Sequence, residues 1–155
     1  MKLHRLCLFA ILPACGSSCP LPDAGGIQAQ IDGEHWEDAN PQWSWTGTGV
    51  QVLTTTTDGW RITLVAQRNA EDDVILDLAD TNGFPAEINL SGTDGFGVIY
   101  DADGQSWTSS KGGSGTLTLK GIDGDVLSAC FSFDAYDSDG ALVEVTSGGA
   151  VATAL

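Results

Sequence analysis

Hydrophobic and polar positions alternate with a period of two along most of the chain after residue 26. In one such segment Trp60, Ile62, Leu64 and Ala66 fall on one side and their neighbours on the other. This period is typical of antiparallel β-strands that have one face in a core and the other in solvent. The segments with this pattern are 27–31, 60–67, 74–79, 96–100, 116–120, 126–134 and 141–146.

Asp-Gly pairs lie next to these segments. The pair occurs six times, at 32–33, 58–59, 94–95, 103–104, 123–124 and 139–140. Asp-Gly between two alternating segments is a strong signal for a β-hairpin turn, and the pairs at 58, 103, 123 and 139 stand in that position. The pair at 32 lies inside the first predicted strand, so we interpret Gly33 as a β-bulge.

No segment after residue 26 shows an apolar stripe of helical spacing and helical length. The closest candidate, 79–88, is interrupted by Asn82-Gly83-Phe84-Pro85. The pattern therefore predicts an all-β domain, an antiparallel meander of about eight to ten strands. Both an up-and-down barrel and a two-sheet β-sandwich satisfy it.

The N-terminus has the pattern of a secretory signal peptide. A basic start with Lys2 and Arg5 is followed by an apolar run of about nine residues, far short of the ~20 that span a bilayer. The run ends in Leu12-Pro13-Ala14-Cys15, which resembles a bacterial lipobox. We predict a signal peptide at 1–14, a lipid on Cys15, a flexible tether at 15–26 and one β domain at 27–155. The alternative is ordinary cleavage near Ala14, which gives a soluble secreted or periplasmic protein.

The charge of the chain limits the classes of partner that it can bind. Six basic and 21 acidic residues give a formal net charge of −15, which becomes −17 when Lys2 and Arg5 leave with the signal peptide. Nucleic-acid binding needs clustered Lys and Arg, so this class is excluded. An acidic surface also disfavours adhesion to anionic lipids, so the predicted lipid would have to hold the domain at a membrane.

The chain has four cysteines, at 7, 15, 19 and 130. Cys7 lies in the signal peptide, and Cys15 is the predicted lipidation site. The alternation over 126–134 places Cys130 on the face away from the main core, where Cys19 on the tether could reach it. Export to an oxidising compartment favours a Cys19–Cys130 disulfide, and the alternative is two free thiols.

Both ends of the domain resemble a family of uncharacterised bacterial lipoproteins with a lipocalin-like β domain. The opening strand resembles the family's phrase in Ile31-Asp32-Gly33 followed by Trp36, and the segments 115–119, 127–135 and 143–148 resemble its closing strands. The resemblance implies a lipocalin-like barrel. The chain departs from the family at Ala129-Cys130, where glycine and threonine are usual, and at Gly148-Gly149-Ala150, where an aromatic residue is often seen. The family has no agreed activity, so it supplies no catalytic residue.

The sequence gives little support for an enzyme or a metal protein. The one histidine after the signal peptide, His35, has no recognisable nucleophile frame around it. The adjacent carboxylates Glu37-Asp38 and Asp72-Asp73 are the basis of a remote alternative, an acid/base hydrolase, but we interpret them as solvated turns. Two Asp-x-Asp-Gly loops, at 101–104 and 137–140, fail the EF-hand frame and are typical of hairpin turns. We expect no catalytic residues, no metal site and no cofactor.

Five tryptophans, at 36, 43, 45, 60 and 107, are many for a domain of this size. Trp43 and Trp45 share one face of a predicted strand, and Trp60 opens another. Such rings fill a β core well, but they could also line a cavity for a small apolar ligand or form a platform for a glycan.

The sequence thus predicts a non-catalytic envelope lipoprotein. Its domain would bind a small apolar ligand among Trp43, Trp45 and Trp60, a glycan, or a partner protein along a sheet edge. The alternative is a structural or surface-coat lipoprotein without a ligand. Because Gly16 rather than aspartate follows Cys15, we favour the outer membrane of a two-membrane bacterium.

Overall fold

The structure is a computed structural model that describes residues 19–45, 49–54, 59–67 and 84–155. The predicted signal peptide, Cys15, the pair Asp72-Asp73 and the predicted strand at 74–79 lie outside these residues.

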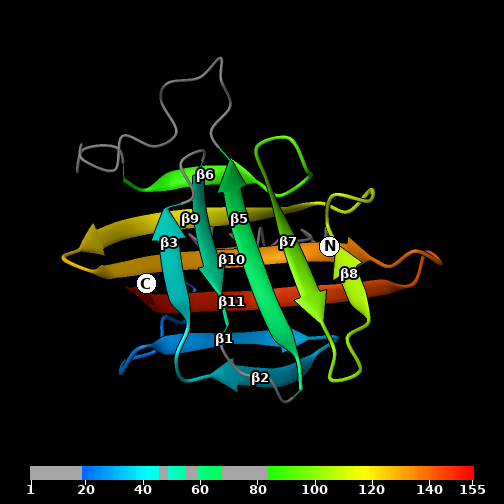
Figure 1. Cartoon of the computed structure of the whole chain (residues 1–155), viewed down its shortest axis with the longest axis horizontal. Coiled ribbons are helices and arrows are strands. Elements are labelled where there is room, and N and C mark those ends of the chain that lie inside the picture. Colours follow the sequence, from blue (N-terminus) through cyan, green and yellow to red (C-terminus); the bar gives the residue numbers. More distant parts are fainter. Residues whose placement is uncertain (1–18, 46–48, 55–58, 68–83) are drawn as a thin grey trace, which may run out of the picture.

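Eleven β-strands form the described part of the chain, which confirms the all-β prediction. They build two layers whose strands cross rather than run side by side (Figure 1). The front layer contains β3 (Gln42–Trp45), β4 (Gly49–Leu53), β5 (Arg61–Gln67), β7 (Gly95–Tyr100) and β8 (Ser106–Thr108). The back layer contains β1 (Gly26–Ile31), β2 (Glu34–Asp38), β6 (Ala86–Asn89), β9 (Gly115–Asp123), β10 (Val126–Tyr136) and β11 (Leu142–Ala154).

The two layers are parts of one hydrogen-bonded sheet. Its order is β2-β1-β11-β3-β4-β5-β7-β8-β10-β9-β6, and a further pairing of β11 with β10 closes the strands from β11 to β10 into a ring, outside which β2–β1 and β9–β6 lie. The layers meet where β11 pairs with β3 at Thr153 and Gln42, and where β10 pairs with β8 at Tyr136 and Thr108. The predicted barrel and the predicted sandwich therefore each describe part of this fold, a partial ring of strands that is flattened into two layers.

The topology is more complex than a plain meander. The structure has eleven strands rather than about eight to ten, and β3 runs parallel to β11, whereas the other described pairs are antiparallel. In addition, β6 leaves the meander between β5 and β7 and pairs with β9 at the edge of the back layer. These pairings join segments that are far apart in the sequence, so the local alternation carries no signal for them.

The Asp-Gly turns lie between strands. The pairs at 103, 123 and 139 lie in the described hairpins β7–β8, β9–β10 and β10–β11. The interpretation of Gly33 as a bulge is wrong. Asp32 and Gly33 both have positive φ, at 50° and 83°, and form a two-residue turn between β1 and β2. Positive φ at both central residues matches the right-handed twist of a hairpin.

The core lies between the layers and is filled by apolar side chains from both. In β10 the predicted alternation holds, because Leu127, Ala129, Phe131 and Phe133 are buried. Inward residues of the front layer, such as Leu64, face them.

No helix in the described part of the chain is long and apolar enough to cross a membrane.

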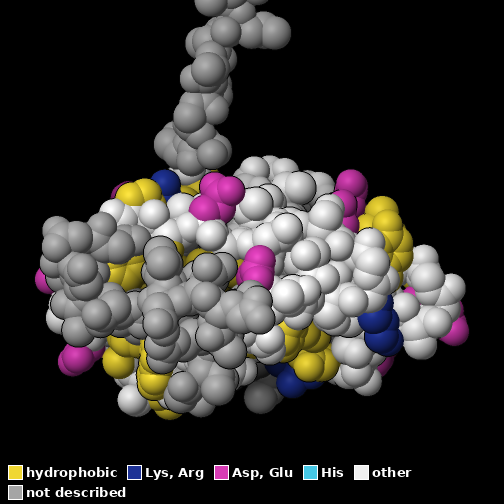
Figure 2. All heavy atoms as spheres, turned by 90° about the horizontal axis from the view of Figure 1, so that it is seen from above, with side chains coloured by type: hydrophobic (Ala, Val, Ile, Leu, Met, Phe, Trp, Pro, Cys, Tyr) yellow, Lys and Arg dark blue, Asp and Glu magenta, His cyan; other side chains and the backbone are white. Residues whose placement is uncertain are grey.

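Acidic side chains are spread over the surface rather than gathered in one patch on the side seen in Figure 2. This distribution keeps like charges apart.

Candidate functional site

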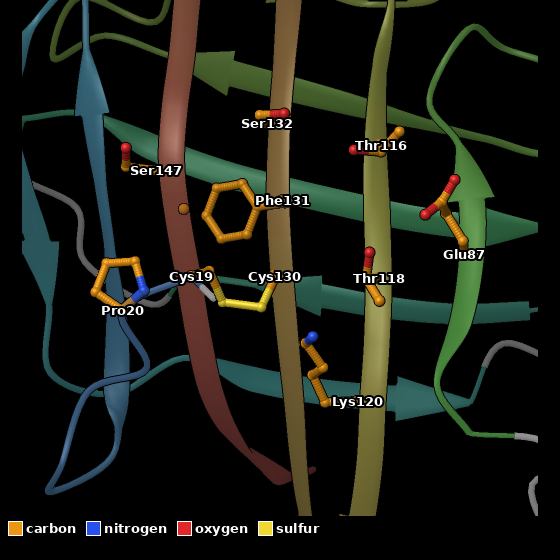
Figure 3. Close-up of a pocket in the computed structure, with 11 residues that line it drawn as sticks. Cys19, Pro20, Glu87, Thr116, Thr118, Lys120, Cys130, Phe131, Ser132 and Ser147 are labelled. Atoms are coloured by element: carbon orange, nitrogen blue, oxygen red, sulfur yellow. A yellow bond between two sulfur atoms is a disulfide. The ribbon is translucent and has the colours of Figure 1, made fainter. Parts of the chain in front are cut away.

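A half-open hollow lies on the outer face of the back layer. It has a volume of about 380 Å³, within the range of small-molecule sites. Strands β6, β9, β10 and β11 and the segment before β1 supply its walls (Figure 3). It is lined by Cys19, Pro20, Glu87, Thr116, Thr118, Lys120, Cys130, Phe131, Ser132, Ser147 and Gly148.

Strand pleating places the polar side chains of the hollow. In β9, Leu117 and Leu119 point into the core, so Thr116, Thr118 and Lys120 project from the outer face. Thr118 pairs with Glu87 of β6 on one side and with Cys130 of β10 on the other. The hollow therefore presents hydroxyl groups together with one cation and one carboxylate.

The N-terminal segment forms one wall of the hollow. A disulfide joins Cys19 to Cys130, with 5.7 Å between the two Cα atoms, a normal separation for a bridged pair. The side-chain amide of Gln28 donates a hydrogen bond to the carbonyl oxygen of Pro20 at 2.7 Å. These two contacts hold the described part of the predicted tether, from residue 19 onward, against the sheet. Strand β1 then starts at Gly26.

Two adjacent glycines in β11 make room for this arrangement. A Cβ at Gly149 would lie 3.0 Å from the carbonyl carbon of Pro20, and a Cβ at Gly148 would collide with the Phe131 ring. Ser147, just before them, has a φ of 52°, and the ladders to β1 and β10 shift register around it. Such a β-bulge re-aims side chains, and here Ser147 lines the hollow. Gly148 and Gly149 therefore help to shape this surface.

A second hollow of about 500 Å³ adjoins the first and shares Glu87, Thr116 and Ser132 with it. It adds Asn89, Asp94, Ser114 and Gly115. The two together form a polar groove across the outer face of β6, β9 and β10.

The three tryptophans predicted to bind a ligand make different contacts. The indole N–H of Trp43 donates to the carbonyl oxygen of Asp125 at 2.9 Å, and Trp45 is 44% exposed near the end of β3. The Trp60 ring packs against Trp107, with 5.6 Å between centroids. None of the five tryptophans lines the polar groove. Trp43 and Trp60 therefore contribute to packing in this structure, and Trp45 remains an exposed ring on the front layer.

The predicted acid/base candidates of β2 point in different directions. Glu37 pairs with the outward Gln28, whereas Asp38 pairs with the inward Ile27 and is buried. Asp38 accepts a hydrogen bond from the backbone N–H of Asn40 at 2.9 Å. The exposed His35 ring lies 3.4 Å from the Glu37 carboxylate. The two carboxylates therefore do not face a common site.

The two Asp-x-Asp-Gly loops are held by their first aspartates. Asp101 Oδ1 accepts backbone N–H groups of Asp103 and Gln105, and Asp137 Oδ1 accepts those of Asp139 and Ala141. Among the residues that the structure describes, no group of three or more His, Cys, Asp or Glu side chains is placed to hold a metal ion.

Sequence reasoning missed the polar groove. The alternating polar residues of 116–120 are visible in the sequence, but alternation alone predicts only a solvent-exposed strand face. The signal that singles them out is their position beside β6 and β10, and this depends on strand order. Comparison with protein-family models, curated proteins and solved structures gave no match.

Proposed function

We propose that this chain is an exported lipoprotein whose β domain is a non-catalytic binding module, anchored to a membrane by a lipid on Cys15. The observation that carries the proposal is the sequence Leu12-Pro13-Ala14-Cys15 at the end of a short apolar leader. The disulfide supports export, because disulfides persist in oxidising compartments. Gly16 after the lipidated cysteine favours the outer membrane.

The binding surface of the module is the polar groove. Its hydroxyl groups, Lys120 and Glu87 offer donors and acceptors for a polar ligand. Of the ligands that the sequence predicts, this chemistry favours a glycan over a small apolar molecule. The alternative is a structural lipoprotein without a ligand.

The anchor is tested by expressing the full chain in a two-membrane bacterium and measuring the mass and the membrane association of the product. We expect the wild-type protein to begin at Cys15, to carry a lipid mass and to sediment with outer membranes. Cys15→Ser should lose the lipid mass. Cys7→Ser is the matched control, because Cys7 leaves with the signal peptide and its replacement should change neither result. A Cys15→Ser product identical to the wild type would refute the anchor.

Ligand binding is tested by titrating the purified chain with soluble oligosaccharides while recording backbone amide chemical shifts. Saturable shifts at Thr116, Thr118 and Ser132 would support a glycan in the groove. If no oligosaccharide shifts these amides, the binding proposal fails, and the structural alternative replaces it.

A further inference from the structure

Residue Cys19 is a fixed point on the outer face of the back layer. Three contacts hold the segment that begins there: the disulfide to Cys130, the hydrogen bond from Gln28 to Pro20, and the packing of Pro20 and Leu21 over Gly149. Cys130 belongs to β10, which has β11 on one side and β9 on the other. The chain therefore leaves the domain from the middle of this outer face and not from its edge (Figure 3).

The distance from this fixed point to the proposed lipid is short. Cys15 precedes Cys19 by four residues, and a fully extended chain spans at most about 3.5 Å per residue, so the reach is about 14 Å. Packed sheets lie about 10 Å apart, and outward side chains add to both sides, so the outer face of the front layer is roughly 20 Å away through the protein. A lipid on Cys15 cannot bring that opposite face to a bilayer.

The charge of the back face does not by itself favour a position near lipid headgroups, because Glu37, Asp134 and Glu144 also point outward there. The described residues that line the hollow include one cation, Lys120, and one carboxylate, Glu87, and are otherwise uncharged. The hairpin turns at the strand ends carry carboxylates such as Asp123 and Asp139. Anionic lipids repel carboxylates over about a Debye length, so the short chain from Cys19 to Cys15, and not charge, would hold this face near the bilayer.

We infer that the outer face of β1, β11, β10 and β9 is the side that lies against the lipid bilayer, and that the Cys19–Cys130 disulfide holds the domain in this orientation. The inference rests on the proposed lipid on Cys15. It places the polar groove toward the headgroups, so a ligand in the groove would be presented at the membrane surface. The front layer, including Trp45, then faces away from the membrane.

Energy transfer from the protein to the membrane tests this orientation. The lipidated full chain is labelled through a genetically encoded reactive amino acid at Gln30, an exposed outward position of β1, or at Gln51, an outward position of β4. These two glutamines form a matched pair, one on each layer. Each variant is reconstituted in phosphatidylethanolamine–phosphatidylglycerol vesicles that contain an acceptor-labelled lipid.

We expect clearly higher transfer from position 30 than from position 51. In the Cys19→Ser, Cys130→Ser double variant, we expect binding to vesicles to persist and the difference between the positions to shrink. Equal transfer, or higher transfer from position 51, with normal vesicle binding overturns the orientation and leaves the anchor intact. Loss of vesicle binding in the parent protein overturns the anchor and the orientation with it. A double variant that keeps the full difference overturns the role of the disulfide.

Discussion

Single aspartates organise the hairpin ends of this domain. The sequence predicts that each Asp-x-Asp-Gly loop is a hairpin turn, and in the structure Asp101 and Asp137 each accept backbone N–H groups of their own turn. The side chain of Gln105 in the first loop also donates to Asp137 Oδ2 in the second at 3.0 Å. This link was not predictable, because it joins turns that only the folded sheet brings together.

Asp137 should make the free energy of unfolding depend on pH in the acid range. The backbone N–H of Ala141 lowers the pKa of Asp137 most strongly; burial opposes this shift, and hydrogen bonds from Asp139, Gln105 and Gly140 add to it. A carboxyl whose folded pKa is lowered stabilises the fold above its ordinary pKa, and the contribution is lost as the pH falls through the lowered value. We expect Asp137→Asn to be less stable than wild type near neutral pH, and the difference to close on the acid side of about pH 4.

Urea unfolding at a series of pH values measures this difference. Asp139→Asn, in the same turn, is the control and should follow the wild-type curve more closely. A difference between wild type and Asp137→Asn that stays constant down to about pH 3 would contradict the assignment.

At the scale of elements, the alternation correctly predicted which residues of β10 enter the core. It did not predict how the layers interlock, because contacts between layers depend on strand order and not on local pattern. Gly97 of β7 illustrates this. A Cβ at Gly97 would lie 2.8 Å from three atoms of the Phe133 ring in the opposite layer. The sequence shows a glycine in a strand, but only the structure shows that the ring occupies the space of its missing side chain.

Replacing Gly97 by alanine should therefore destabilise the domain by about 1–3 kcal/mol through overpacking. Gly121→Ala is the matched control, since a Cβ at this β9 glycine meets nothing within 4 Å; it should change the stability by less than about 0.5 kcal/mol. Chemical denaturation of the two variants compares them directly. Equal stabilities would show that the Phe133 ring moves aside without cost.

For the whole molecule, the sequence was sufficient for the fold class and insufficient for the closure of the sheet. The hairpins follow from local turns, whereas the parallel contact of β3 with β11 and the placement of β6 beside β9 are set by tertiary packing. The Cys19–Cys130 bridge is a long-range tie of the same kind, with a sequence separation of 111. Sequence reasoning reached this pair because Cys130 lies on a predictable outer face.

The disulfide should contribute strongly to the free energy of unfolding. A bridge that closes a loop of this length restricts the unfolded chain by about 4–5 kcal/mol on the chain-entropy model. We expect the Cys19→Ser, Cys130→Ser double variant to lose stability of this order in urea unfolding, and treatment of the wild type with a reductant to reproduce the loss. If neither changes the unfolding midpoint, the bridge does not form in the protein.

The position of β11 in the sheet also bears on when the domain can form. This strand pairs with β1, β10 and β3. Strands β1 and β3 therefore cannot complete their pairing in the sheet until β11 is available. As the chain emerges from a ribosome or a membrane pore, β1 appears long before β11 and has no neighbour except β2. Such non-local pairing slows folding. If the chain is exported as proposed, a sheet that cannot close before β11 has passed keeps the chain unfolded during its passage through a secretion channel.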